Sequence, residues 1–249
     1  RTPKTLKDNQ EEDEFLKELN ADLAIVCAYG QIIPENFLNL TKKGFVNIHA
    51  SILPSWRGAA PIQRSIMNLD PETGISIMKI KKELDSGPVS NIYKIKIDQN
   101  QNAQEISEKL SALAAEKILD NVDDILEDKA KFIDQDHSKA TYAKKIDKEE
   151  SRIDWDEDAS KIIGKINGLF PSPGASFSFN GERYKILKAE IGNGIGQVGE
   201  IISNQLEVAC NKNQSIKILE IQRQGKRPQK ISEFMLGSQI KKGLKLSNV

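Results

Sequence analysis

Hydrophobic and polar residues follow two different spacings along this 249-residue chain, and together they predict an α/β protein. In the first part, apolar runs of strand length alternate with segments whose apolar residues recur every three or four positions, the spacing of a buried helix face. The expected strands cover residues 23–29, 44–49, 75–78 and 89–97, and the expected helices cover residues 9–20, 58–68 and 106–125. The first of these strands is apolar throughout, as in a parallel strand buried on both faces. Alternating strands and helices favour a mostly parallel sheet.

The pattern changes in the second part of the chain. Residues 127–140 are polar and charged without an apolar period, so we expect a linker there, after a first domain over residues 1–126. A helix near residues 162–169 is followed by short β-rich runs that Gly and Asn separate. The runs cover residues 175–179, 184–191, 198–202, 206–209 and 216–221. Short strands with regular turn signals favour a small β-barrel as the second domain, over residues 141–249.

Charge separates the two parts of the chain although the whole is neutral, with 36 basic and 36 acidic residues. Residues 1–150 hold 21 basic and 26 acidic side chains, a net charge of −5, whereas residues 151–249 hold 15 and 10, a net charge of +5. A basic second part suits a polyanionic partner. A surface of ordinary solvated lysines explains the same count, so charge alone leaves the partner open.

Cysteine content and hydropathy indicate a compartment. Cys27 and Cys210 are the only cysteines and lie far apart in the sequence, which provides no disulfide framework and favours the reducing cytoplasm. No apolar run approaches the roughly 18 residues of a membrane span. No Cys or His pair has ligand spacing, and His137 stands alone in the expected linker, so we expect no metal.

The most informative segment is a β-rich run that ends in Asn47-Ile48-His49. Residues two apart on a strand point to the same side, so Asn47 and His49 project together at the carboxyl end of the strand, where open α/β sheets bind their ligands. A carboxamide beside an imidazole can stabilise an oxyanion and move a proton. A histidine on a strand is often only structural, and that alternative stays open at this point.

Asp85 is the third candidate for the same chemistry. It lies in Leu84-Asp85-Ser86-Gly87-Pro88, between two expected strands. Because strand ends converge in α/β folds, its distance in sequence from His49 is no obstacle to a shared site. An aspartate before Ser-Gly-Pro is also a common turn former, so the residue types alone do not decide its role.

Three motifs together resemble the folate-dependent formyltransferases. They are Asn47-Ile48-His49, the segment Ser51-Ile52-Leu53-Pro54 with the Trp56-Arg57-Gly58 that follows it, and Leu84-Asp85-Ser86-Gly87-Pro88. The resemblance implies a Rossmann-like formyltransferase domain followed by a small OB-like β-barrel domain. It also implies 10-formyltetrahydrofolate as the formyl donor.

Roles for individual residues follow from the resemblance. It implies that Asn47 donates to the formyl oxygen, that His49 stabilises the tetrahedral oxyanion and assists proton transfer, and that Asp85 orients the imidazole and accepts a proton from the attacking amine. The implied folate-binding residues are Ser51, Ile52, Leu53, Pro54, Ala28, Tyr29 and Gly30. Ser55 departs from the family pattern, which commonly has a basic residue there.

The second part of the chain points to the acceptor. Residues 141–155 and 167–175 resemble a junction found in the members of the family that formylate the α-amino group of methionyl-initiator tRNA for translation initiation, and also in their multi-domain relatives. Residues 225–237 most resemble the closing helix of the members that act on this tRNA. We therefore expect a monomeric cytoplasmic enzyme whose partners are that tRNA and the folate, with no membrane association. The basic candidates for tRNA contacts are Lys144, Lys145, Arg152, Arg223, Lys226, Arg227 and Lys230.

Two alternatives of different classes stay open. One is a related folate-dependent enzyme that acts on a sugar-nucleotide amine or on water. The other is an RNA-binding module without catalysis.

The family pattern also implies sequence before Arg1 that supplies the first strands of the Rossmann-like sheet and a basic loop for the tRNA stem. We expect this chain by itself to fold poorly and to be inactive, because a sheet without its first strands exposes an unpaired edge.

Overall fold

The structure is a computed structural model that describes residues 1–247 and divides into two compact units. Unit 1 holds Arg1–Pro61, Glu72–Lys96 and Glu108–Lys145, and unit 2 holds Ile62–Pro71, Ile97–Ser107 and the chain from Ile146 onward. No helix within the described residues combines the length and apolar character needed to cross a membrane.

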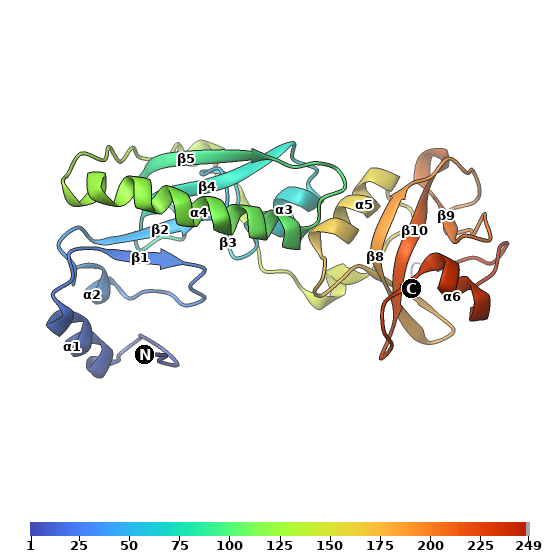
Figure 1. Cartoon of the computed structure of the whole chain (residues 1–249), viewed down its shortest axis with the longest axis horizontal. Coiled ribbons are helices and arrows are strands. Elements are labelled where there is room, and N and C mark those ends of the chain that lie inside the picture. Colours follow the sequence, from blue (N-terminus) through green and yellow to red (C-terminus); the bar gives the residue numbers. More distant parts are fainter. Residues whose placement is uncertain (248–249) are drawn as a thin grey trace. The chain divides into compact units, whose positions relative to one another are not determined.

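Unit 1 is built on a four-stranded sheet in the order β1-β2-β4-β5 (Figure 1). Its elements are α1 (Gln10–Leu19), β1 (Ala24–Cys27), α2 (Glu35–Leu38), β2 (Phe45–His49), β3 (Arg57–Gly58), β4 (Glu72–Lys79), β5 (Val89–Lys96), most of α4 (Ala103–Leu126), the 3-10 helix η1 (His137–Lys139) and β6 (Tyr142–Ala143). Strands β1 and β2 are parallel, whereas β4 is antiparallel to both of its neighbours. The expected mostly parallel sheet is therefore mixed. A short loop joins β4 to β5, and parallel pairing would have required a crossover connection there.

The core of unit 1 lies between the sheet and α4. Val46 of β2 and Ile77 of β4 are fully buried against Ile125 of the helix. Tyr93 of β5 packs against the same cluster, and its hydroxyl accepts a hydrogen bond from the Asn121 amide at 2.7 Å. This packing joins β2, β4 and β5 to α4.

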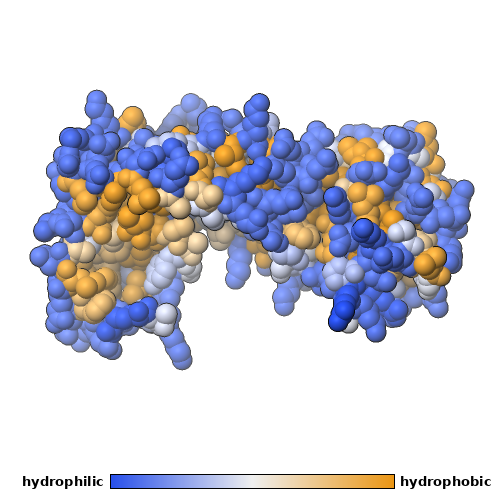
Figure 2. Space-filling model, in the orientation of Figure 1, coloured by the Kyte–Doolittle hydropathy of each residue, from blue (hydrophilic) through white to orange (hydrophobic). Residues whose placement is uncertain are grey.

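Strand β1 departs from its expected burial. Its residues alternate between partly buried and exposed, with Ile25 47% exposed and Cys27 also exposed. Tyr29, just beyond the strand, is 42% exposed. Figure 2 shows apolar side chains gathered on the visible face of unit 1. The prediction of a strand buried on both faces was wrong, because an apolar run does not show which of its faces another element covers.

The segment expected to link the domains, residues 127–140, packs within unit 1. Ile133 and Val89 exchange two backbone hydrogen bonds of 2.9 Å, and Phe132 packs against the core cluster. Gln135 is only 8% exposed. The polar composition of this segment therefore conceals the backbone and side-chain contacts that tie it to unit 1.

Unit 2 is built on a five-stranded antiparallel sheet in which β10 is the central strand. Its elements are α3 (Pro61–Met67), the 3-10 helix η2 (Lys148–Ser151), α5 (Ala159–Gly168), β7 (Ser176–Phe179), β8 (Glu182–Ile191), β9 (Glu207–Cys210), the 3-10 helix η3 (Asn211–Asn213), β10 (Gln214–Arg223), β11 (Gln229–Lys230) and α6 (Ile231–Gly237). The path runs β11-β10-β8-β7, and β9 also pairs with β10. Within residues 1–247 no pairing joins β7 to the far edge, so the expected barrel is an open sheet. Residues 198–202, expected as a strand, form only isolated bridges at Glu200 and Ile201.

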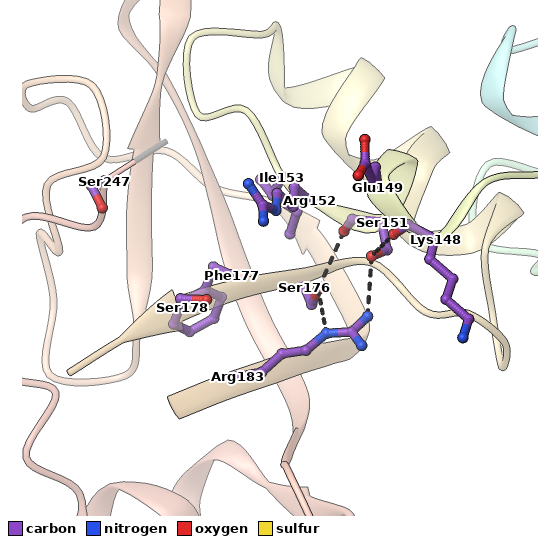
Figure 3. Close-up of a pocket in the computed structure, with 10 residues that line it drawn as sticks. All are labelled: Lys148, Glu149, Ser151, Arg152, Ile153, Ser176, Phe177, Ser178, Arg183 and Ser247. Carbon is purple, nitrogen blue, oxygen red and sulfur yellow. Dashed lines mark hydrogen bonds between the residues drawn. The ribbon is translucent and has the colours of Figure 1, made fainter. Parts of the chain in front are cut away.

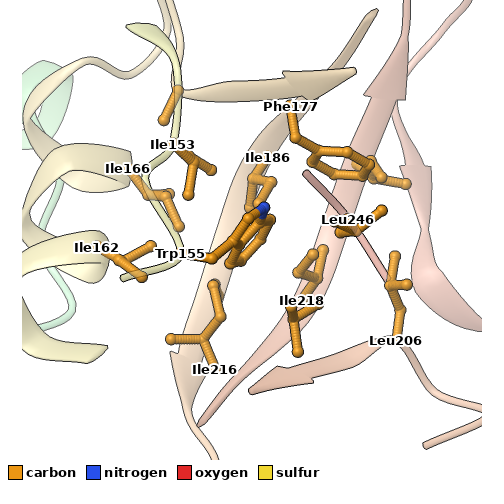
Figure 4. Packing of buried hydrophobic residues seen from close by; sticks show 14 of the residues in the cluster. Ile153, Trp155, Ile162, Ile166, Phe177, Ile186, Leu206, Ile216, Ile218 and Leu246 are labelled. Carbon is orange, nitrogen blue, oxygen red and sulfur yellow. The ribbon is translucent and has the colours of Figure 1, made fainter. Parts of the chain in front are cut away.

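The core of unit 2 surrounds Trp155, which is fully buried (Figure 4). The indole meets the Phe177 ring edge-on at a centroid distance of 5.9 Å, and Phe177 in turn stacks on Tyr184 at 5.4 Å. Aliphatic side chains from α5 and from strands β8 and β10 complete the cluster, among them Ile162 and Ile218.

We expect Trp155→Ala to lower the free energy of unfolding by about 3–5 kcal/mol, because the surrounding side chains cannot close a cavity of that size. The measurement is urea unfolding followed by far-ultraviolet circular dichroism. Leu236→Ala is the control, since this side chain is 87% exposed and its loss is expected to cost under about 0.5 kcal/mol. Equal midpoints for the two variants would contradict the assignment of Trp155 to the core.

Candidate active site

Strand β2 carries the two polar residues that the sequence placed on one side. Its parallel register with β1 sets Asn47 opposite Val26, close to the carboxyl ends of both strands. His49, the last residue of β2, is only 6% exposed. Asn47 is half-buried, and within residues 1–247 its side chain forms no hydrogen bond. The site therefore offers a carboxamide that is held in place by the sheet and still available to a ligand.

Both ring nitrogens of His49 face protein oxygens. Nε2 lies 2.9 Å from the backbone carbonyl of Trp56, and Nδ1 lies 3.6 Å from Oδ2 of Asp85. A carbonyl oxygen only accepts, so Nε2 carries a hydrogen and donates it. In the neutral ring Nδ1 then holds the lone pair and faces a carboxylate. This geometry gives the pair a place for one further proton, which is what a general acid or base requires.

An unusual backbone conformation aims the Trp56 carbonyl at His49. Trp56 has φ of +62°, a left-handed conformation that is strained for a bulky residue. Its N–H donates to the Thr141 hydroxyl at 2.9 Å, and the next N–H, of Arg57, donates to the Thr141 carbonyl at 2.9 Å. The short β3–β6 pairing thus holds the strained turn that fixes the imidazole.

Gly58 connects this turn to Asp85. Its N–H donates to Oδ2 of Asp85 at 2.8 Å, the same oxygen that faces His49. Its φ is +121°, and a Cβ there would lie 2.8 Å from the Ala143 carbonyl oxygen. Only glycine fits this position without strain, so the contact that orients the carboxylate depends on it.

A buried network holds the Asp85 loop from behind. Nε2 of Gln135 donates to the carbonyls of Asp85 at 2.8 Å and Gly87 at 2.7 Å. Oε1 of Gln135 accepts from Arg57 Nε at 3.1 Å and Nη2 at 2.7 Å. Arg57 is only 3% exposed, and its Nη2 also lies 3.3 Å from His137 Nδ1. The sequence did not identify Gln135, because a lone glutamine 50 residues after Asp85 carries no local signal.

The first segment expected to bind folate, Ser51–Pro54, forms a rigid turn. Ser51 is fully buried, and its hydroxyl donates to the Ser55 carbonyl at 2.6 Å. The Ser76 hydroxyl donates to the Ser51 carbonyl at 2.7 Å and accepts from the Leu53 N–H at 3.1 Å. The Ser51 and Leu53 side chains are thus committed to the interior, whereas Ile52 and Pro54 are partly exposed.

The second expected segment, Ala28–Tyr29–Gly30, is exposed and follows β1. Cys27 pairs with Ile48 in the parallel register, so the chain leaves β1 at the same edge at which His49 ends β2. The sheet therefore brings this segment to the edge that carries the candidate catalytic residues. Within the described residues, no three His, Cys, Asp or Glu side chains form a group that could hold a metal ion.

The site combines three side chains: the Asn47 carboxamide, which has no hydrogen-bond partner within residues 1–247, the His49 imidazole, and the Asp85 carboxylate that faces it. Backbone groups of Trp56 and Gly58 hold the imidazole and the carboxylate in place. Such a set can stabilise negative charge on a carbonyl oxygen and move a proton during attack by an amine. These are the requirements of acyl transfer, and of formyl transfer in particular.

The chain belongs to the formyl transferase family. Residues 1–122 match the model of the formyl transferase domain, and residues 145–239 match that of the formyl transferase C-terminal domain. The chain is 66% identical over 249 residues to the methionyl-tRNA formyltransferase of Pelagibacter ubique, covering 100% of this chain and 80% of that protein. It is 40% identical over 247 residues to the methionyl-tRNA formyltransferase of Brucella anthropi, covering 98% of this chain and 80% of that protein.

Solved structures share the fold at lower identity. HypX from Aquifex aeolicus in complex with tetrahydrofolic acid matches with a TM-score of 0.70 and 18% identity, covering 94% of this chain and 41% of that chain. The sugar 3N-formyl transferase WlaRD, solved with dTDP and 5-N-formyl-THF, matches with a TM-score of 0.69 and 21% identity, covering 85% of this chain and 77% of that chain.

Proposed function

We propose that the protein transfers the formyl group of 10-formyltetrahydrofolate to the α-amino group of methionyl-initiator tRNA. The relatives named for this activity match the chain over almost its whole length. The single observation in the structure that carries the proposal is the His49–Asp85 approach of 3.6 Å on the sheet edge that also presents the Asn47 carboxamide. A folate donor agrees with the family and with the two folate-type ligands named for the structural neighbours.

The proposed mechanism gives each of the three residues a task. The neutral amine attacks the formyl carbon, and the side-chain amide of Asn47 donates a hydrogen bond to the oxygen on which negative charge develops. His49 faces the same region with its Nδ1 edge and adds to the stabilisation once that nitrogen is protonated. Asp85, oriented by Gly58, accepts the proton that the amine loses, through His49 or through water. Collapse of the tetrahedral species then breaks the bond from the formyl carbon to N10 of the folate. That nitrogen takes up a proton, which balances the one lost by the amine, and tetrahydrofolate is released.

The domains divide the task under this proposal. We assign catalysis to the first domain, residues 1–126, and tRNA binding to residues 141–249, with residues 127–140 between them. The basic second part of the chain favours binding of a polyanion there. The proposal places the protein in the cytoplasm as a monomer, where it meets charged initiator tRNA.

The test compares acceptors with the protein at its full natural length. With 10-formyltetrahydrofolate as donor, methionyl-initiator tRNA is expected to be formylated at least about 100-fold faster, in kcat/KM, than a dTDP-linked amino sugar, because a site built for one acceptor leaves polar groups unpaired with another. Hydrolysis of the donor without acceptor is the control. Formylation of the amino sugar alone would move the assignment to the sugar-nucleotide enzymes.

A further inference from the structure

Unit 2 contains a basic pocket far in sequence from the candidate active site. It has a volume of about 270 Å³ and is lined by η2, the chain that follows it, β7 and β8. Its cationic lining consists of Lys148, Arg152 and Arg183, and Glu149 is the one acidic residue (Figure 3). The pocket therefore has an excess of positive charge.

Two buried hydroxyls hold Arg183 in place. Its Nε donates to the Ser176 hydroxyl at 2.9 Å, and its Nη2 donates to the Ser151 hydroxyl at 3.1 Å (Figure 3). Both serines are only 3% exposed. The Ser151 hydroxyl donates its own hydrogen to the Lys148 carbonyl, and the Ser176 hydroxyl donates to the Ser151 carbonyl. A guanidinium has five N–H donors in a fixed fork, so two serve the serines and three remain for a ligand.

Among residues 1–247, no carboxylate pairs with Arg183. In the part of the chain that the structure describes, neither Arg183 nor Lys148 nor Arg152 forms an ion pair. The hydrogen bonds of Arg183 all go to neutral hydroxyl oxygens. Arg223 on β10 is the contrast, because its guanidinium pairs with Glu182. That pairing also lowers the pKa of the Glu182 carboxyl, together with a hydrogen bond from Tyr184.

We propose that this pocket binds a phosphate group, with the Arg183 fork as its central contact and Lys148 and Arg152 at its rim. A planar fork held by neutral groups suits two oxygens of one phosphate, and two further cations match its charge. On the proposed function, the phosphate is a backbone phosphodiester of the tRNA. Such contacts position an RNA without reading its sequence.

The experiment measures binding of methionyl-initiator tRNA to the full-length protein across a range of salt concentrations. Arg183→Gln is expected to weaken binding about tenfold and to reduce the slope of log K against log salt by about 0.7–0.9, the loss of one phosphate contact. Lys212→Gln removes the same unit of charge from an ion pair with Asp158, at a position outside the pocket, so it measures the general electrostatic loss. Lys148→Gln changes an exposed side chain and should leave the fold intact, so it tests the pocket even if Arg183→Gln folds poorly. We expect it to weaken tRNA binding by less than Arg183→Gln does.

Equal affinity and slope for Arg183→Gln and Lys212→Gln, with Lys148→Gln matching the wild type, would overturn the proposal. A second arm titrates inorganic phosphate into the wild type and Arg183→Gln by calorimetry, which separates the pocket from its partner. If the wild type bound no tRNA, the proposed function would fail. Phosphate binding that Arg183→Gln removes would then still support the pocket, and phosphate binding that is absent or insensitive to Arg183 would reject it.

Discussion

Replacing Asp85 with asparagine is expected to lower kcat/KM for formyl transfer by about 10²–10⁴-fold. The variant keeps the shape of the side chain and an oxygen that can accept from the Gly58 N–H, a bond of 2.8 Å in the structure. It removes the charge that faces His49 Nδ1 at 3.6 Å, and with it the carboxylate that we propose takes the proton of the amine. The loss should therefore appear in the rate of transfer while the thermal stability changes little.

The measurement is the initial rate of N-formylmethionyl-tRNA formation with 10-formyltetrahydrofolate as donor. Glu83→Gln is the matched control, because it removes one carboxylate from the same loop at an exposed position. Its rate should remain close to that of the wild type. Retention of more than about a third of wild-type kcat/KM by Asp85→Asn, under about 1 kcal/mol of transition-state stabilisation, would show that the carboxylate does not take part in proton movement.

The second large effect is expected at Gln135, whose side-chain amide holds the backbone of the Asp85 loop and does not contact the Asp85 carboxylate. Replacing Gln135 with alanine removes the donors to the carbonyls of Asp85 and Gly87 and the oxygen that accepts from Nε and Nη2 of the buried Arg57. We expect kcat to fall by about 10–100-fold through misplacement of Asp85, and the free energy of unfolding to fall by about 1–3 kcal/mol.

A double-mutant cycle distinguishes positioning from a general loss of structure. If Gln135 acts through Asp85, the variant Gln135→Ala/Asp85→Asn is no slower than Asp85→Asn alone. Multiplied losses in the double variant would count against this role. Gln135→Glu adds a second comparison, because its carboxylate can still accept from Arg57 but cannot donate to the two carbonyls. Low activity in a stable Gln135→Glu variant would identify the donors as the catalytically relevant part of the network.

The sequence located the reactive side chains more reliably than the groups that hold them. The two-residue period of a strand put Asn47 and His49 on one side, and β2 ends at His49 as that period requires. The position of Asp85 between two strands allowed its approach to His49, and the structure brings the two side chains together. Their catalytic roles rest on the family resemblance and stay predictions.

The supporting groups could not be predicted because they act through the backbone or from far along the chain. The Trp56 carbonyl reaches His49 because Trp56 has a left-handed backbone conformation. The residue type does not predict that conformation for a tryptophan. Gln135 lies in a polar segment that resembles a linker until its bonds to the Asp85 loop are seen. The open sheet of unit 2 was missed for a related reason, since barrel closure depends on pairing between distant strands rather than on the pattern within each.

The most direct test of the central claim is single-turnover transfer between the two proposed substrates, with the protein at its full natural length. The wild type and His49→Ala are tested in separate reactions, each in excess over formyl-labelled 10-formyltetrahydrofolate and methionyl-initiator tRNA. Transfer of the label to the methionyl amine is followed over time. The account predicts rapid transfer by the wild type and a rate reduced about 100-fold or more in His49→Ala. Transfer at the same rate in the variant, or none to the tRNA by a folded wild type, would contradict it.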